Sequence, residues 1–377
     1  MKTGISRLRL NNFRSYEALD LSFGTGGEPV ALVGHNGAGK TNVLEAISYL
    51  TPGRGLRSAR LSDVARRMGE DVYPLWSVVA DTYSPFGDNK IGTGMVEGAE
   101  RRQTRINGKP TTRQSDLAEV FRCLWLTPAQ DRLFCGDPNA RRRFLDRIVQ
   151  AFDPNHANRL ADYSTALKQW LCLLREGRLD NAWLEGLEQQ LVENGIAISA
   201  SRLDIVGRLS SYLDVSPDPN FPSAEIHLTG LLEEALQSQG AVLVEDMFAG
   251  RLKNARKICA EGGNLTGPHT ADFTVLHKQQ NRSADLCSTG EQKALLISII
   301  LAEMRAQMAE QGRCPILLLD EVGAHLDANR RHSLFEILLG LPTQVWMTTT
   351  ESQIFADFTG QIMQFDVQEN KELKQVA

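Results

Sequence analysis

Residues 34–41 constrain the fold of this chain more than any other segment. They read Gly-His-Asn-Gly-Ala-Gly-Lys-Thr and lie between the apolar run at 30–33 and the apolar-periodic run at 42–47. A glycine-rich loop between a strand and a helix is a P-loop, in which backbone N–H groups converge on phosphate oxygens and the helix N-terminus adds its positive dipole end. The sequence therefore predicts an α/β fold built around a phosphate site.

The predicted loop assigns a role to each kind of residue in it. We expect Lys40 to reach the β- and γ-phosphates of ATP, and Thr41 to offer its hydroxyl to Mg²⁺, which bridges those phosphates. Arg14, after the first predicted strand, is a further candidate for phosphate contact, with a structural salt bridge as the alternative. The complete set of predicted nucleotide-binding residues is Gly34, His35, Asn36, Gly37, Ala38, Gly39, Lys40, Thr41 and Arg14.

Length and composition narrow the class of protein. The chain has 377 residues, which exceeds one typical domain, and a net charge of −5. No apolar stretch reaches the roughly 20 residues of a membrane span, and the N-terminus lacks a secretory apolar region. Six scattered cysteines without a CxxC pair argue against a disulfide framework or a zinc site. We therefore expect a cytoplasmic protein with no membrane partner.

Periodicity predicts the remaining elements. The first 25 residues alternate as a hairpin, and the segments 75–80 and 95–106, the second followed by Asn107-Gly108, predict an antiparallel side sheet. Residues 138–260 have helical periodicity, interrupted at Gly177 and Gly195. Strand patterns return at 273–276, 316–319, 345 and 362, and helices are expected from Gly290 and Asn329.

These elements predict an α/β ATPase head, with a mixed sheet and an antiparallel side sheet, that carries an inserted, mainly helical second lobe. We expect residues 1–122 and 266–377 to form the ATP-binding ATPase lobe. Residues 123–265 are expected to form the inserted lobe.

A second motif completes the predicted hydrolytic set. The apolar run at 316–319 ends in Asp320 and Glu321, the pattern of a Walker B strand. Asp320 is expected to hold Mg²⁺ through water, and Glu321 to polarise the attacking water. The predicted catalytic residues are therefore Lys40, Asp320 and Glu321, with Thr41 and Asp320 as the Mg²⁺ residues.

The order of motifs near the end of the chain resembles that of the ABC-type ATPases. In that class a serine-glycine signature contacts the γ-phosphate on another subunit's P-loop, and an aspartate after Walker B lies at the subunit interface. The resemblance assigns the signature in trans to Ser288 and Gly290 and the interface role to Asp327; helix N-capping is the alternative for Ser288. It implies an ATP-dependent homodimer that parts on hydrolysis. Thr348, Thr349 and Thr350 stand where transporter ATPases carry a switch histidine, which indicates slow turnover.

A closer resemblance extends over nearly the whole chain. It is carried by residues 9–16, by the P-loop, by Ile106-Asn107-Gly108, and by the segments 136–138, 141–146 and 266–269. These segments resemble the RecF family of DNA replication and repair proteins, which are similar to SMC heads without their long coiled coils. The resemblance implies weak ATPase activity, ATP-driven dimerisation on gapped single-strand/duplex DNA, and cooperation with RecR and RecO to load RecA.

DNA binding requires a basic surface despite the acidic total charge. Two basic clusters are the candidates, with ordinary solvated faces as the alternative. One follows the P-loop helix (Arg54, Arg57, Arg60, Arg66 and Arg67), and the other lies on the Asn107-Gly108 hairpin (Arg101, Arg102, Arg105, Lys109 and Arg113). Contacts of this kind neutralise phosphates and make binding strongly salt-dependent. The candidate DNA-binding residues are Arg54, Arg57, Arg60, Arg101, Arg102 and Arg105.

Other readings remain open at this point. They include the nucleotide-binding ATPase subunit of another ABC/SMC-type machine, a transporter subunit, and a monomeric P-loop phosphotransferase. Gln130 is a candidate nucleotide-sensing glutamine. His269 is either a hydrogen-bonded structural histidine or a catalytic one.

Overall fold

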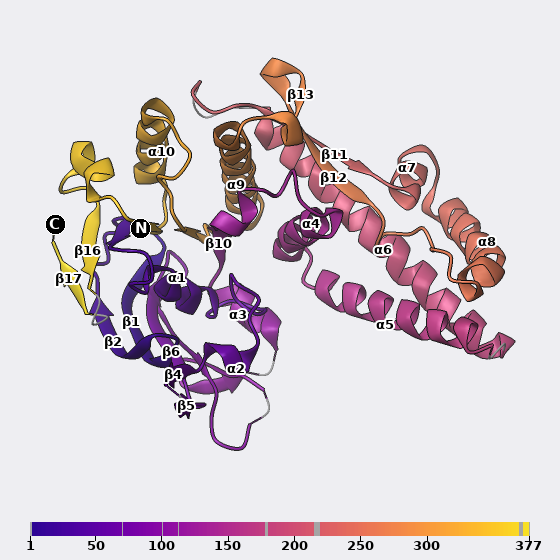
Figure 1. Ribbon diagram of the computed structural model, residues 1–377, viewed down its shortest axis with the longest axis horizontal. Helices are drawn as coiled ribbons and strands as arrows, with labels where there is room; N and C mark the ends of the chain where they lie inside the picture. Colours follow the sequence, from indigo (N-terminus) through magenta and orange to yellow (C-terminus); the bar gives the residue numbers. More distant parts are fainter. Residues whose placement is uncertain are drawn as a thin grey trace. The chain divides into compact units, whose positions relative to one another are not determined.

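The computed structural model describes residues 2–69, 71–99, 101–111, 113–177, 180–214, 219–368 and 372–376 (Figure 1). The chain forms two compact units. Unit 1 contains Met1–Asp131, Pro217–Asn220 and Gln307–Ala377, and unit 2 contains Arg132–Ser216 and Phe221–Ala306.

The first sheet of unit 1 is mainly parallel. Its strand order is β10 (Cys123–Leu126), β14 (Ile316–Leu319), β15 (Val345–Thr349), β3 (Val30–Val33), β16 (Met363–Val367) and β17 (Leu373–Gln375), and β17 alone of the six runs antiparallel to its neighbour. Its central strands are short apolar runs buried almost completely, as expected for strands covered on both faces. This is the mixed sheet that the sequence predicts.

The second sheet of unit 1 is antiparallel throughout. Its order is β2 (Tyr16–Ser22), β1 (Gly4–Phe13), β6 (Ser77–Tyr83), β7 (Asn89–Gly94), β8 (Gln103–Ile106) and β9 (Lys109–Thr111). Asn107 and Gly108, between β8 and β9, both have positive φ values (51° and 79°), so the predicted hairpin turn is confirmed. The predicted strand at 95–106 is wrong over its first part, because Glu97 and Gly98 form a turn there.

Helix α1 (Lys40–Ser48) shares one apolar core with both sheets. Its buried face includes Val43, Leu44 and Ile47. Unit 1 also contains α2 (Leu61–Val64), the small hairpin β4 (Arg66–Met68) and β5 (Asp71–Tyr73), α3 (Gln114–Val120), η1 (Pro128–Gln130), α10 (Ala328–Gly340) and η4 (Ser352–Phe358).

Unit 2 is mainly helical. It contains α4 (Pro138–Phe152), α5 (His156–Arg175), α6 (Asn181–Leu213), α7 (Leu231–Ser238), α8 (Ala241–Ala260), η2 (Lys278–Gln280), η3 (Ala284–Leu286) and most of α9 (Thr289–Gln311). Helices α5 and α6 pack side by side (Figure 1). A small sheet is formed by β11 (Ala224–Thr229), β12 (Asp272–His277) and β13 (Arg282–Ser283).

Two expectations for this helical region are wrong. Gly195 does not interrupt the helix, because it lies inside the 33-residue α6, where a Cβ would stand only 3.1 Å from the Phe248 ring. The glycine therefore allows close packing between α6 and α8. Strand β11 was also not expected, although its buried and exposed residues alternate strictly. The interruption at Gly177 is confirmed between α5 and α6, while residues 178–179 of that connection lie outside the described residues.

The two units do not coincide with the two predicted lobes. Residues 123–131 belong to unit 1, and residues 266–306 belong to unit 2. A compact unit is a set of residues that contact one another and need not be the part that binds ATP. The expected ATP-binding lobe (residues 1–122 and 266–377) and the expected inserted lobe (residues 123–265) therefore stay predictions.

A buried cluster of ionisable side chains links α4 to α6 within unit 2. Arg202 on α6 donates to both carboxylate oxygens of Asp146 on α4 at 2.8 and 2.9 Å, and the ring nitrogen Nε2 of His156 lies 2.8 Å from Asp146 Oδ1. Arg202 also donates to the carbonyl oxygen of Pro268 at 2.6 Å. Burial alone would raise the pKa of Asp146, but the bonds from His156 and Arg202 outweigh it and hold that pKa below its ordinary 3.8.

The replacement Asp146→Asn should destabilise the protein strongly. The change leaves Arg202 buried without its counter-charge, which typically costs about 3–5 kcal/mol. Because the pKa of Asp146 is lowered in the folded state, this carboxylate adds to the free energy of unfolding in full above pH 3.8. That stabilisation is lost as the pH falls through the folded-state pKa. Denaturant unfolding at neutral pH and along an acid series measures both effects.

The matched control is Asp204→Asn, which removes an exposed ion pair with Arg208 on the same helix. That change should cost no more than about 0.5 kcal/mol. Equal effects of the two replacements would contradict the importance of the buried cluster.

Candidate nucleotide-binding site

The P-loop leaves the carboxyl end of β3, which lies between β15 and β16 in the parallel sheet. Its last glycine, Gly39, is the N-cap of α1 and has φ 111°, a conformation that disfavours side chains. A Cβ at Gly39 would also lie 2.9 Å from the Tyr16 hydroxyl, which donates to the Gly39 carbonyl at 3.2 Å. The loop is thus held against β2 while His35, Asn36 and Gly37 remain exposed.

Lys40 is folded back over the loop. Its ammonium donates to the carbonyl oxygens of Gly34 and His35 at 2.5 and 2.9 Å. Burial lowers the pKa of Lys40, and the carboxylates of Glu321 and Asp320 act in the opposite direction. The ammonium therefore lies beside the loop that would surround a phosphate.

Three strands bring the predicted Mg²⁺ residues together. The Thr41 hydroxyl, at the start of α1, lies 2.9 and 3.1 Å from the two carboxylate oxygens of Asp320, which follows β14. Strand β15 lies between β14 and β3 in the sheet, and its buried Thr348 donates to Asp320 Oδ1 at 2.7 Å. The carboxyl ends of parallel strands meet at one edge of a sheet, where ligands of open α/β sheets bind.

The same threonine orients the backbone of the predicted catalytic glutamate. The Glu321 backbone N–H donates to the Thr348 hydroxyl at 2.8 Å, and Glu321 has φ 53°. A non-glycine residue in this left-handed region is uncommon and needs support from its surroundings. The Glu321 side chain is exposed at a cavity of about 180 Å³ that Asn36 and Thr349 also line.

The residues present fit a Mg²⁺ ion. The ion prefers oxygen ligands and is commonly bound by one or two carboxylates together with substrate phosphates. Thr41 and Asp320 supply a hydroxyl and a carboxylate that already point at each other. When bound, the ion would neutralise charge on the β- and γ-phosphates.

Arg14 and Arg57 are both engaged by Glu45, a fully buried residue of α1. Arg14 contacts the two Glu45 carboxylate oxygens at 2.6 and 2.9 Å, and Arg57 reaches one of them at 3.0 Å. Arg57 also donates to the side-chain oxygen of Asn42 at 2.9 Å. Arg14 therefore forms a structural salt bridge, which the sequence offered as the alternative to phosphate contact.

The signature and interface residues lie at helix N-termini. In unit 2, Ser288 precedes α9 and exchanges hydrogen bonds with Glu291 in a capping box, while Gln280 donates to the same carboxylate. These donors lower the pKa of Glu291 to about 2. Ser288 is exposed and Gly290 is partly exposed. In unit 1, Asp327 is the N-cap of α10 and accepts from the Arg330 backbone at 2.9 Å.

Gln130 and His269 both have local partners. The Gln130 side chain accepts from the backbone N–H of Thr127 at 3.0 Å, in a capping box at η1. His269 has a partner at each ring nitrogen, the Tyr163 hydroxyl at 2.8 Å and the Leu265 carbonyl at 2.9 Å. Burial is the main cause that lowers the pKa of His269. These contacts are those of a structural histidine.

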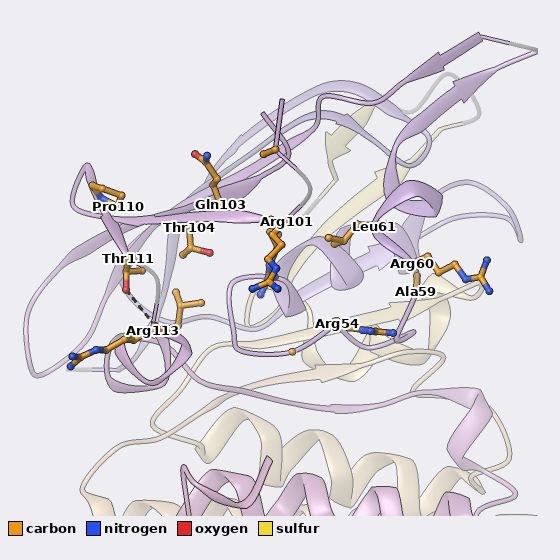
Figure 2. A pocket seen from close by; sticks show the side chains of 14 residues that line it. Arg54, Ala59, Arg60, Leu61, Arg101, Gln103, Thr104, Pro110, Thr111 and Arg113 are labelled. Carbon is orange, nitrogen blue, oxygen red and sulfur yellow. Dashed lines mark hydrogen bonds between the residues drawn. The ribbon is translucent and has the colours of Figure 1, made fainter. Parts of the chain in front are cut away.

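The predicted DNA-binding arginines separate into different environments. Arg102 donates to the carbonyl oxygens of Tyr49 and Thr51, at the end of α1, and lies over the Tyr49 ring. Arg54, Arg60 and Arg101 are exposed and line one cavity of about 990 Å³ (Figure 2). Arg105 is exposed on β8 and does not line that cavity.

Several residues of these sites were missed by sequence reasoning. Thr348 was considered only in place of a histidine, yet its hydroxyl joins Asp320 to Glu321. Glu45 could have been noticed as an acidic residue at a helical position otherwise expected to be apolar.

Comparisons with known proteins identify the class and then the family. Residues 4–374 match the family described as the RecF/RecN/SMC N terminal domain, the class that this fold and P-loop define. The DNA replication and repair protein RecF of Mesorhizobium japonicum is 46% identical over 363 residues, which cover 95% of this chain and 94% of that protein. RecF of Brucella suis is 42% identical, with 97% and 95% covered. The chain belongs to the RecF family of DNA replication and repair proteins.

Solved structures agree with this fold. The recombination mediator protein RecF-ATPrS of the RecFOR pathway superposes with a TM-score of 0.82 at 22% identity, covering 100% of this chain and 99% of that one. The Smc head domain of Pyrococcus furiosus, with an extended coiled coil, gives 0.56 at 15% identity and covers 100% and 96%. No helix in the described part of the chain has both the length and the apolar character needed to cross a bilayer.

Thr348 should matter more for stability than its size suggests. Thr348→Val keeps the shape but removes the hydroxyl that joins Asp320 and the Glu321 backbone, so the buried partners lose bonds at a cost of about 1–3 kcal/mol. Thr348→Ser keeps the hydroxyl and should recover most of that loss. Denaturant unfolding of both variants without nucleotide measures the effect, and equal stability of valine and wild type would contradict this role.

Proposed function

We propose that this chain is an ATP-dependent DNA-binding protein of recombinational repair and replication restart. It binds ATP with Mg²⁺ at residues 34–41, forms a homodimer on gapped single-strand/duplex DNA, and hydrolyses ATP slowly as a switch. The observation that carries this proposal is the convergence of Thr41, Asp320 and Thr348 at the carboxyl edge of the parallel sheet. Membership of the RecF family agrees with it.

In this proposal each residue at the sheet edge has a separate task. Lys40 leaves the carbonyl oxygens of the P-loop to contact phosphate, and Thr41 and Asp320 hold the metal ion. Glu321 accepts a proton from the attacking water, since the exposed carboxylate lies at the cavity beside Asn36. Thr349 and Thr350 stand at the end of β15 where a switch histidine would act, which supports slow hydrolysis.

The second half of the composite site comes from a second copy of this chain. Ser288 and Gly290 are exposed at the N-terminus of α9, where backbone N–H groups and the helix dipole favour an anion. We propose that they contact the γ-phosphate held by the other copy, and that Asp327 lies at the same interface. A symmetric pair of this kind buries two ATP molecules.

The DNA contacts are assigned to exposed arginines of unit 1. Within the described ranges, no carboxylate pairs with Arg54, Arg60, Arg101 or Arg105. Arg57, in contrast, pairs with Glu45, and Arg102 donates to backbone carbonyls. Unpaired guanidinium groups are available to neutralise phosphates.

RecR, RecO and RecA are proposed as partners, with RecR and RecO acting to load RecA. The support is family membership and the solved RecF structure named for the RecFOR pathway. The place of action that follows from these partners is the cytoplasm.

ATP should dimerise the wild-type chain on gapped DNA, and Glu321→Gln should prolong the dimer. Loss of a general base typically slows the chemical step about 10²–10⁴-fold, so ATP stays bound between the two copies. Light scattering, with ATP hydrolysis followed in parallel, measures both. Lys40→Ala is the control that should stay monomeric, and a monomer under every condition would exclude the clamp mechanism.

The double variant Arg101→Ala, Arg105→Ala should bind gapped DNA with a weaker salt dependence. Each lost phosphate contact reduces the slope of log K against log salt concentration by about 0.9 on B-form DNA and by about 0.7 on a single strand. Fluorescence anisotropy over a salt series gives the slope. Arg7→Ala is the control, because the charge of Arg7 is already neutralised by Asp20. An unchanged slope in the double variant would remove these two arginines from the DNA-binding surface.

A further inference from the structure

The cavity of about 990 Å³ in unit 1 is lined by three segments that are separate in the sequence. One is the loop from Gly53 to Leu61 after the P-loop helix, the second runs from Ala99 into β8, and the third joins β9 to α3. Five arginines line it: Arg54, Arg60, Arg101, Arg102 and Arg113. We call it the arginine cavity.

Among the described lining residues, the positive charge of this cavity is largely uncompensated. No carboxylate is among the lining residues that the structure describes. Arg102 is engaged with the carbonyl oxygens of Tyr49 and Thr51. Within the described ranges, the guanidinium groups of Arg54, Arg60, Arg101 and Arg113 form no ion pair or side-chain hydrogen bond. Like charges held around one hollow repel each other unless an anion lies between them.

The arginines are spread along the cavity rather than gathered at one point. In Figure 2 Arg113 and Arg60 lie at opposite ends of the view, with Arg101 and Arg54 between them. One phosphate group would reach only part of such a set. A ligand with several phosphates in a row fits it better.

The rest of the lining suits the backbone and sugars of a nucleic acid strand. Ala59, Leu61 and Leu117 provide apolar surface, and Gln103 and Thr111 provide hydrogen-bonding groups. A duplex is wider than its own major groove, which is about 12 Å across, and so cannot enter a hollow of about 990 Å³, which equals a cube with an edge of about 10 Å. A single strand is narrower and flexible, and proteins that bind one without sequence preference do so in positively charged grooves.

We propose that the arginine cavity holds an unpaired DNA strand by its successive phosphates, and so distinguishes the single-stranded side of a gap from the duplex side. This inference rests on the proposed DNA-binding function and specifies the part of the DNA that this cavity takes. Arg54 and Arg101 contact phosphates inside the cavity, while Arg105, outside it, contributes equally to any DNA.

The test compares an oligothymidine with a blunt duplex that carries the same number of phosphates, both bound to the full chain and followed by fluorescence anisotropy over a salt series. The double variant Arg54→Ala, Arg101→Ala should lose about 0.7 per arginine from the single-strand salt slope, or about 1.4 in all, with the duplex slope unchanged. Arg105→Ala should weaken binding of both DNAs by the same factor. Arg101→Lys keeps the charge and should keep the slope.

The outcomes separate this inference from the proposed function. If the double variant weakens single strand and duplex equally, or changes neither, the cavity does not select an unpaired strand, although DNA binding and ATP-driven dimerisation stand. If the wild type binds neither DNA, the proposed function itself fails. Displacement of the oligothymidine by an equal phosphate concentration of inorganic pyrophosphate would identify a site for free polyphosphates and overturn the assignment. Thermal unfolding of each variant confirms that it is folded.

Discussion

The hydrogen bonds of Thr348 are the interaction on which the candidate nucleotide site depends. Strand register aligns Leu319 with Met347 and Met347 with Ala31, so Asp320 and Thr348 lie one residue further along, at the end of the sheet where the P-loop begins. A single hydroxyl then fixes the Asp320 carboxylate and the Glu321 backbone together. Because β14, β15 and β3 are parallel neighbours, residues far apart in the sequence come together in one site. A shift of one residue in β15 would turn the hydroxyl to the other face of the sheet and separate them.

The arginines near the P-loop helix show how the same residue type serves different purposes. Glu45 is buried on α1 and would be costly without a counter-charge, and Arg14 and Arg57 provide two. Arg102 donates to the carbonyls of Tyr49 and Thr51, just beyond the C-terminus of the same helix, where a cation is favoured by the helix dipole. Arg101, its neighbour in the chain, points into the arginine cavity (Figure 2). Exposure and partners, rather than the count of positive charges, therefore decide which arginines are available to DNA.

Sequence reasoning succeeded where the physical cause is local. The P-loop, the Asn107-Gly108 turn and the buried strand before Asp320 each follow from a short run of residues with a defined backbone requirement. It failed where tertiary packing decides. Gly195 continues a helix because Phe248 fills the space beside it, and β11 forms because β12 pairs with it from a distant part of the chain. The arginine cavity is likewise invisible in sequence, since its walls come from three separate segments.

Helix α1 joins the two proposed ligand sites physically. Its N-terminus begins at the P-loop, and the loop after its C-terminus supplies Arg54 and Arg60 to the arginine cavity. Nine residues of helix span only about 13 Å, which exceeds the Debye length of about 8 Å at physiological salt. Direct electrostatic repulsion between the two phosphate-bearing ligands at these ends is therefore weak, and any coupling between them must pass through the position of the helix. Arg102 donates to the carbonyls of Tyr49 and Thr51, just after α1, and also forms part of the cavity wall, so a DNA strand that moved this wall would act on the helix that begins at the proposed nucleotide site.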